Sequence, residues 1–213
     1  MSTLPDRYVM LGAGGHARVL QETLALQGIT LDGFIAPSAD SQLVGTEWLG
    51  TDDAFSRLDP ASVLLVNGVG SVRAPALRRE IYTSALAAGF RFATVIDQTA
   101  VVRPSVVLGA GVQVLAGAIV NTDAVVGENS IVNTGAIVEH GARVGAHVHI
   151  APGAKLAGDV TVGEESHIGL GASVMQGISV GSQCTVGAGA VVTRDVSDGS
   201  TAVGVPAISR PAS

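Results

Sequence analysis

The chain has few aromatic residues, few charges and almost no cysteine. Of its 213 residues, 3% are aromatic, 14% are charged and only Cys184 is a cysteine. A core built on large rings is therefore excluded, and a single cysteine cannot form an internal disulfide. No apolar run approaches the about 20 residues of a membrane span, and the opening MSTLPDR lacks the basic and then apolar pattern of a signal peptide. We expect a cytoplasmic protein without a membrane partner.

Positive charge is also scarce. The formal net charge is −6, and Lys and Arg form no cluster along the sequence. Nucleic-acid binding depends on a basic surface that neutralises phosphates. The sequence therefore argues against a nucleic acid as the main partner.

An aliphatic residue stands at every sixth position from Ile96 to Val192, without exception. Neither the helical period of 3.6 nor the strand period of 2 produces this pattern. A period of six indicates a short strand followed by a corner, and three such strands form one 18-residue coil of a parallel β-helix. The aliphatic residues should fill the interior, and smaller residues four positions later, including Cys184, should pack beside them.

The first 95 residues alternate between expected strands and helices, which predicts a small parallel α/β domain of the Rossmann-like kind. We expect strands at 7–13, 31–36, 62–70 and 91–96, and helices at 14–28, 52–58 and 73–89. The chain then divides into an α/β domain (1–95), a β-helix (96–197) and a C-terminal tail (198–213).

Two glycine-rich loops fall where the strands of that domain end. The first, GAGGHA, fits G-x-G-x-x-A with Gly12 and Gly14, and it opens a helix, which suits a phosphate group. A nicotinamide dinucleotide site wants an acidic residue after the second strand, where Ala36 and Pro37 stand, so NAD is disfavoured. A phosphate or nucleotide group of another ligand is favoured, and a tight turn without a ligand is the alternative. The second loop is 67–70.

Histidines are the main candidates for chemistry in the β-helix. Residues 18 apart stack at the strand spacing of about 4.8 Å, so His149 should lie beside His167, and His140 beside Gly158. His140 is expected at a corner, pointing outward, with open backbone at Gly141 and Gly158 where a substrate could approach. A solvated surface residue is the alternative for each histidine, most of all for His147.

The segment IVNTGAIVEH (131–140), together with LGAGGHARV and GVPA (204–207), resembles a known family. It is that of the hexapeptide-repeat acetyltransferases, of the sialic acid O-acetyltransferase and bacterial nucleotide-amino-sugar N-acetyltransferase type. The resemblance implies a left-handed β-helix, a homotrimer, and acetyl-CoA in a groove between two subunits. It implies N-acetylation of a nucleotide-linked 4-amino-4,6-dideoxy sugar, as in polysaccharide biosynthesis, with no metal and no NAD.

The resemblance also implies roles for individual residues. His140 matches the general base, His149 the histidine that contacts acetyl-CoA, and Asn133 an asparagine near the acceptor. The glycine loops should hold the acceptor's nucleotide and phosphates through Gly12, Gly14, Gly15, His16, Asn67 and Gly68. The groove for acetyl-CoA maps onto His149, Gly158, Leu170, Gly171, Ala188 and Pro206.

Two departures from the family pattern bear on the site. Many relatives carry an acidic residue directly after the base, where this chain has Gly141. We therefore hypothesise that Asp123, 18 residues before Gly141, or Asn121 beside it, bonds the His140 ring. Relatives that bind uridine-linked sugars have an Asp-Asp pair where Ala36 and Pro37 stand, so guanine, thymine and uracil all stay open.

The expected chemistry follows from the thioester. A histidine with an ordinary pKa of about 6.5 suits the removal of the sugar amine's proton, and the Gly158 amide could stabilise the oxyanion. Three other readings stay open: O-acetylation of a sugar or sialic acid, a non-catalytic β-helix scaffold, and a nicotinamide-dependent enzyme.

Overall fold

The computed structural model describes residues 7–40, 43–70 and 75–211. The chain divides between Val95 and Ile96 into two compact units. The first contains all the helices that the structure describes, and the second is built from short strands.

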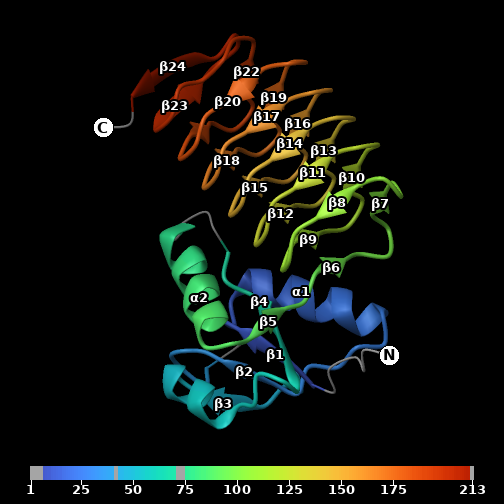
Figure 1. Ribbon diagram of the computed structural model, residues 1–213, viewed down its shortest axis with the longest axis vertical. Helices are drawn as coiled ribbons and strands as arrows, with labels where there is room; N and C mark the ends of the chain where they lie inside the picture. Colours follow the sequence, from blue (N-terminus) through green and yellow to red (C-terminus); the bar gives the residue numbers. More distant parts are fainter. Residues whose placement is uncertain (1–6, 41–42, 71–74, 212–213) are drawn as a thin grey trace. The chain divides into compact units, whose positions relative to one another are not determined.

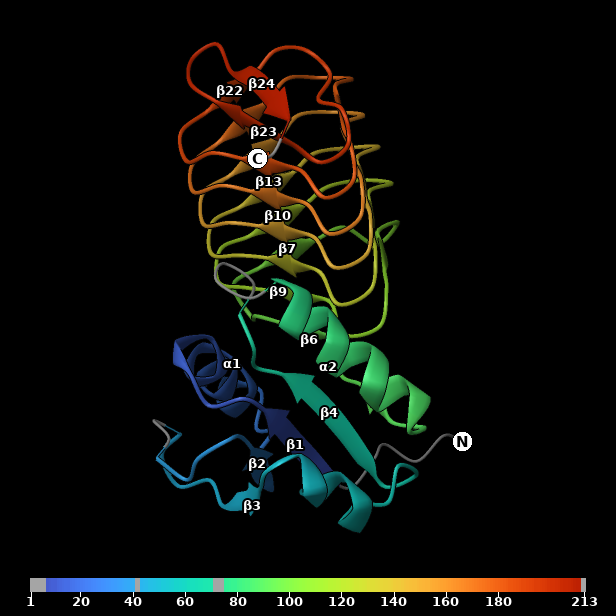
Figure 2. The same cartoon turned by 90° about the vertical axis from the view of Figure 1, so that its left-hand side faces the viewer.

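The N-terminal unit is a five-stranded parallel sheet with a helix on each side (Figures 1 and 2). Its strand order is β3-β2-β1-β4-β5, so neighbouring strands β1 and β4 lead their helices to opposite faces. Ligands of such sheets bind beyond the carboxyl ends of the strands at this switch point. The elements are β1 (Arg7–Leu11), α1 (Gly15–Leu26), β2 (Gly33–Ile35), β3 (Trp48–Gly50), the 3-10 helix η1 (Asp52–Arg57), β4 (Val63–Asn67), α2 (Pro75–Ala87) and β5 (Arg91–Phe92).

Two strand predictions for this unit need correction. Strand β3 was not expected, because it is short and its Trp48 is exposed; it pairs with β2, and Trp48 Nε1 donates to the Ala36 carbonyl at 3.0 Å. The expected strand at 91–96 is two strands. β5 (Arg91–Phe92) pairs with β4, whereas β6 (Val95–Ile96) belongs to a sheet of the β-helix, so the chain changes sheets within this segment.

The second unit is a left-handed parallel β-helix whose coils stack as three sheets (Figure 1). Sheet 1 contains β6, β9 (Gln113–Val114), β12 (Ile131–Val132), β15 (His149–Ile150), β18 (His167–Ile168) and β21 (Thr185–Val186). Sheet 2 contains β7 (Val101–Val102), β10 (Ile119–Val120), β13 (Ile137–Val138), β16 (Lys155–Leu156), β19 (Ser173–Val174) and β22 (Val191–Val192). Sheet 3 contains β8 (Val107–Leu108), β11 (Val125–Val126), β14 (Arg143–Val144), β17 (Thr161–Val162) and β20 (Ser179–Val180).

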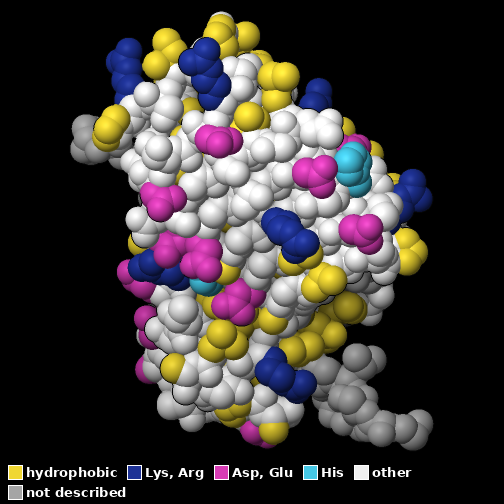
Figure 3. Space-filling view, turned by 45° about the horizontal axis from the view of Figure 1, so that its top comes forward, with side chains coloured by type: hydrophobic (Ala, Val, Ile, Leu, Met, Phe, Trp, Pro, Cys, Tyr) yellow, Lys and Arg dark blue, Asp and Glu magenta, His cyan; other side chains and the backbone are white. Residues whose placement is uncertain are grey.

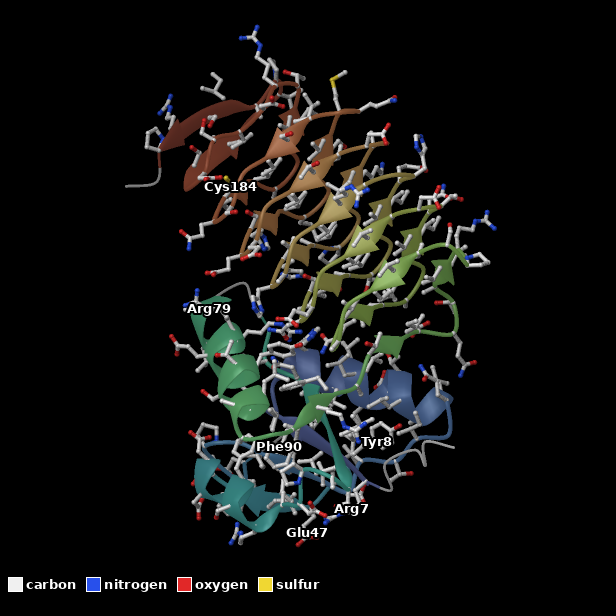
Figure 4. All side chains as sticks on the ribbon, in the orientation of Figure 1. Arg7, Tyr8, Glu47, Arg79, Phe90 and Cys184 are labelled. Atoms are coloured by element: carbon white, nitrogen blue, oxygen red, sulfur yellow. The ribbon has the colours of Figure 1, made fainter. Side chains whose placement is uncertain are left out.

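The interior follows the six-residue period. Every sixth residue from Val114 to Val192 is buried in one continuous aliphatic cluster, and Cys184 lies within it (Figure 4). Each fully buried aliphatic side chain contributes about 1.5–3 kcal/mol. Val102 and Leu108 are only partly buried and Ile96 is 37% exposed, because these residues lie in the first coil, at the end of the stack.

From Gly111 to Gly189, each corner turns through one left-handed residue, three positions after the interior aliphatic residue. Glycine takes many of these positions, as at Gly141 and Gly171. Six others are polar non-glycine residues with φ between 55° and 59°, and Asp and Asn tolerate this conformation best. They are Asp123, Asn129, His147, Asp159, Glu165 and Gln183.

The C-terminal segment completes sheet 1 instead of leaving the β-helix. β23 (Ser200–Val203) pairs in parallel with β21, and β24 (Ile208–Pro211) pairs antiparallel with β23. On the face shown in Figure 3, Lys and Arg side chains are scattered and acidic side chains lie between them. No helix among the described residues is long and apolar enough to cross a membrane.

Candidate active site

His140 lies in the corner between sheets 2 and 3, after β13 and before β14. Its side chain is exposed, as the sequence predicts. A Cβ added to Gly158, one coil further on, would lie 2.5 Å from Cε1 and Nε2 of the His140 ring. The predicted neighbour relation is confirmed: the imidazole rests on the backbone of Gly158, and only glycine leaves room for it.

Gly158 also presents a backbone N–H group. The equivalent amides one and two coils earlier are held by the preceding side chain: His140 N donates to Glu139 Oε2 (3.1 Å), and Thr122 N donates to Asn121 Oδ1 (2.9 Å). Before Gly158 stands Ala157, whose methyl group accepts nothing. No described residue accepts a hydrogen bond from the Gly158 amide, so this donor is available beside the imidazole.

The hydrogen bond that we expected from Asp123 or Asn121 to the His140 ring is not formed between these described residues. Asn121 Nδ2 instead donates to Glu139 Oε2 at 3.0 Å. The Asp123 backbone N–H donates to Ser105 Oγ, and its carboxylate makes no bond to His140. The spacing of 18 identified a coil neighbour of Gly141 correctly, but it did not determine which way that side chain leans.

Asn133 and His149 form a second pair, in the corner between sheets 1 and 2. Asn133 Oδ1 accepts from the Thr134 N–H (2.8 Å), so its amide nitrogen faces His149 Nε2 at 3.0 Å. In this orientation Asn133 is the donor and Nε2 the acceptor, and the tautomer of His149 that fits this bond carries its proton on Nδ1. His149 is only 5% exposed, so this bond satisfies a buried group.

His167 lies beside His149 on the next coil, in register with it, as the sequence predicts. The two rings meet edge to face with their centroids 5.0 Å apart. Burial lowers the pKa of His167 below its ordinary 6.5, because the charged form would lose hydration. The shift favours the neutral form of His167 in this wall of the β-helix.

Within one chain, the structure does not bring all the predicted catalytic residues together. Asn133 precedes β13 and His140 follows it, so the two side chains lie at different corners of the same coil. Asp123, His140 and Gly158 share one corner, and Asn133, Leu170, Gly171 and Ala188 share the other.

The residues expected to bind acetyl-CoA offer exposed apolar surface and free backbone. Leu170 is 59% exposed, and Ala188, one coil further on, is also exposed. Each follows a glycine, so no side chain caps its amide, and no described residue accepts a hydrogen bond from either N–H. Gly171 is the left-handed residue of its corner (φ 63°), and Pro206 is exposed after β23.

A cavity of about 510 Å³ opens in the N-terminal unit, at the carboxyl ends of β1 and β2. Its wall is mostly apolar and includes Phe55 from η1 and Ile81 from α2. The Ala36–Pro37 segment, where no acidic residue stands, also lines it. The polar side chains in its wall come from Asp52, Glu80 and Ser84.

The first glycine loop lies at the edge of this cavity. Gly12 lines the cavity and is left-handed (φ 85°); a Cβ there would lie 2.9 Å from Val69 Cγ2. Gly14 is the N-cap of α1 and Gly15 its first residue, with no capping side chain and no acidic residue in the first turn. His16 is half-buried in the same turn. This helix N-terminus is suited to an anionic group.

The second glycine loop is explained by close packing and backbone hydrogen bonds. Gly68 packs so closely that a Cβ would lie 2.6 Å from Met10 Sδ and 2.7 Å from Ala17 Cβ. Buried Asn67 donates to the Arg78 carbonyl (3.2 Å), and Arg78 Nη1 donates to the carbonyls of Asn67 (2.9 Å) and Val69 (2.6 Å). Burial lowers the pKa of Arg78 to about 9, so it still carries its charge at neutral pH.

Among the residues that the structure describes, no three His, Cys, Asp or Glu side chains are grouped as metal ligands.

Family models match three segments of the chain. Residues 7–86 match the PglD N-terminal domain, 123–158 the bacterial transferase hexapeptide (six repeats) and 159–194 the hexapeptide repeat of succinyl-transferase. A comparison with curated proteins gives no match.

Solved structures match the complete fold. A histidine-to-asparagine variant of perosamine N-acetyltransferase from Caulobacter crescentus, in complex with CoA and GDP-perosamine, is 38% identical with a TM-score of 0.90, and the alignment covers 97% of each chain. The acetyltransferase domain of PglB from Neisseria gonorrhoeae FA1090, in complex with acetyl coenzyme A, is 38% identical with a TM-score of 0.89, covering 95% of this chain and 98% of that one. The chain belongs to the hexapeptide-repeat acetyltransferases of this type.

The structure also brings forward residues that were not predicted from the sequence. The polar cavity residues Asp52 and Glu80 were read only as parts of helices. The signal that could have found them is topological: η1 and α2 lie next to the carboxyl edge of β1 and β2. Asp159, whose carboxylate lies against Gly141, was missed because the 18-residue spacing does not tell toward which coil a corner side chain leans.

Proposed function

We propose that this acetyltransferase moves the acetyl group of acetyl-CoA to the amino group of a nucleotide-linked 4-amino-4,6-dideoxy sugar. The observation that carries the proposal is the His140 corner, where an exposed imidazole stands beside the free Gly158 amide. A base and an oxyanion donor side by side are what acyl transfer from a thioester requires. The similar structures with CoA, acetyl coenzyme A and GDP-perosamine support the same donor and acceptor classes.

In this reaction the amine nitrogen attacks the thioester carbonyl carbon and a C–N bond forms. His140 takes the proton that the nitrogen loses, and the Gly158 N–H stabilises the carbonyl oxygen as it becomes an anion. The C–S bond then breaks, and the CoA sulfur leaves as a thiolate that takes up a proton. A general base contributes roughly 10²–10⁴-fold, so replacement of His140 should lower turnover by that range and leave substrate binding intact.

The apolar cavity of the N-terminal unit supports a guanine nucleotide. Guanine presents two neighbouring N–H groups on one edge, which a carboxylate accepts as a pair. Asp52 and Glu80 provide carboxylates in the cavity wall, and Phe55 provides a flat apolar surface. Uracil and thymine present one N–H between two carbonyl oxygens, which would face the same carboxylates unfavourably. The N-terminus of α1, which has no capping side chain, would hold the phosphates, through Gly14, Gly15 and His16.

The working unit is a homotrimer in this proposal. His140 and the Asn133–His149 pair lie at different corners of one chain, so a site that uses both needs a second copy. Acetyl-CoA would lie between the two, against the free amides of Leu170 and Ala188. A cytoplasmic location stays a prediction.

The proposal is tested by mixing the purified protein with acetyl-CoA and matched acceptors. We expect release of CoA thiol, and a gain of one acetyl group by mass spectrometry, with a GDP-linked 4-amino-4,6-dideoxy sugar. UDP- and dTDP-linked forms should react more slowly, and the 4-hydroxy sugar and sialic acid should not react. The His140→Ala variant is the matched control. Transfer to sialic acid alone would establish the O-acetyltransferase alternative instead, and transfer to none of the acceptors would refute the proposal.

The trimeric site is tested by complementation. His140→Ala and His149→Ala proteins, each nearly inactive, are unfolded, mixed and refolded together. Mixed trimers contain interfaces in which both histidines are intact, so activity should return. Activity that stays at the level of the separate variants would show that each chain carries a complete site.

A further inference from the structure

A carboxylate lies on the backbone beside the proposed base, and it comes from the following coil. A Cβ added to Gly141 would collide with Oδ1 of Asp159 and would lie 3.3 Å from its Cγ. The Asp159 backbone N–H also donates to the His140 carbonyl at 2.9 Å. The Asp159 side chain therefore folds back onto the coil that carries His140, and Gly141 provides the space for it.

The His140 ring leans in the opposite direction. It reaches over Gly158, the residue directly before Asp159, while the Asp159 carboxylate reaches over Gly141, the residue directly after His140. The ring and the carboxylate thus occupy neighbouring positions between the same two coils. Their arrangement depends on two glycines, because a Cβ at Gly141 or at Gly158 would displace one of the two side chains.

The structure gives the Asp159 carboxylate no other task. No described residue forms a hydrogen bond or ion pair with it, and its side chain is exposed. Its backbone is left-handed (φ 58°), a conformation in which glycine or asparagine would cost less. The Asp159 side chain, exposed, without a partner among the described residues and on a left-handed backbone, therefore contributes little to stability.

We propose that Asp159 is a positioning residue for His140: its carboxylate lies beside the ring's coil and balances the positive charge that the ring gains with the amine's proton. This proposal rests on the proposed function. A fixed charge that faces a charge developing in the transition state lowers the barrier without tightening substrate binding. The effect of Asp159 should therefore appear in kcat and not in KM.

The chain offers a matched control in Asp123, which occupies the same corner two coils earlier. It is also exposed and left-handed (φ 59°), and its replacement changes the net charge equally. Asp159→Asn should lower kcat about tenfold, or about 1.4 kcal/mol in activation free energy, with both KM values within twofold. Asp123→Asn should stay within twofold of wild type in every constant.

Rescue separates a charge role from a structural one. In the double variant Gly141→Asp, Asp159→Gly, the carboxylate moves to position 141 and the space that it needs is freed. This variant should recover at least half of the lost kcat on a logarithmic scale. Equal constants for Asp159→Asn and Asp123→Asn, a loss confined to KM, or no rescue would overturn the role of Asp159. Wild-type protein that acetylates no acceptor would overturn the proposed function itself.

Discussion

Replacement of Gly158 by alanine tests the geometry of the His140 corner directly. The new Cβ would lie 2.5 Å from the ring atoms Cε1 and Nε2, whereas ordinary contacts begin at 3.4 Å, so the ring must withdraw by about 1 Å. A misplacement of that size costs on the order of 100-fold in rate, or about 2.7 kcal/mol. We expect kcat for acetyl transfer to fall by that factor, with KM values nearly unchanged.

Stability should respond very differently. Gly158 is not in the left-handed region, so alanine fits its backbone and reduces the entropy of the unfolded chain by about 0.4–1 kcal/mol. The exposed ring can swing into solvent at little cost. We expect the melting temperature of Gly158→Ala to stay within about 3 °C of wild type.

A double-mutant cycle with His140→Ala is the control. Without the ring there is nothing for the new methyl group to displace, so Gly158→Ala should have no further effect in that background. Steady-state assays of CoA release on the four proteins give the coupling energy. A single variant with more than a third of wild-type kcat, or an equal loss in both backgrounds, would refute the reasoning that the ring rests on Gly158.

Three further predictions concern the rest of the molecule. Gly68→Ala should lower the free energy of unfolding by about 1–3 kcal/mol, because its new Cβ meets Met10 and Ala17. Gly14→Ala, which has open space around it, should leave the melting temperature unchanged but weaken GDP binding in a titration. Asn133→Ala removes the donor to buried Nε2 of His149 and should lower the melting temperature by about 5 °C. Burial sets the pKa of His167 below its unfolded 6.5, so its protonation opposes folding: thermal stability should fall as pH drops below about 6.5, and His167→Gln should flatten that fall.

The six-residue period predicted the β-helix almost completely, because each interior residue repeats in the same surroundings. It also predicted coil neighbours correctly, as for His149 with His167 and for His140 with Gly158. It could not tell whether a corner side chain leans toward the coil before or the coil after. For that reason Asp123, or Asn121 beside it, was expected to bond the His140 ring, although the carboxylate that reaches this coil belongs to Asp159.

The N-terminal cavity was harder to predict for another reason. Its glycine loop is a local motif that follows a strand and opens a helix, so the sequence alone located Gly12 and Gly14. Asp52 and Glu80 come from η1 and α2, which meet only when the parallel sheet orders its strands as β3-β2-β1-β4-β5. Such a meeting is a property of the tertiary fold, and no periodicity within one segment encodes it.

The two corners that flank β13 place their histidines in different environments. At one corner His140 is exposed, so it can gain and lose a proton in contact with an acceptor. At the other, His149 is buried and its Nε2 faces the Asn133 amide, so it can serve as a fixed polar contact. One rigid strand separates them, so no side-chain rotation within the chain joins the two. In the function that we propose, a site that uses both histidines would therefore pair the His140 corner of one copy with the Asn133 corner of another.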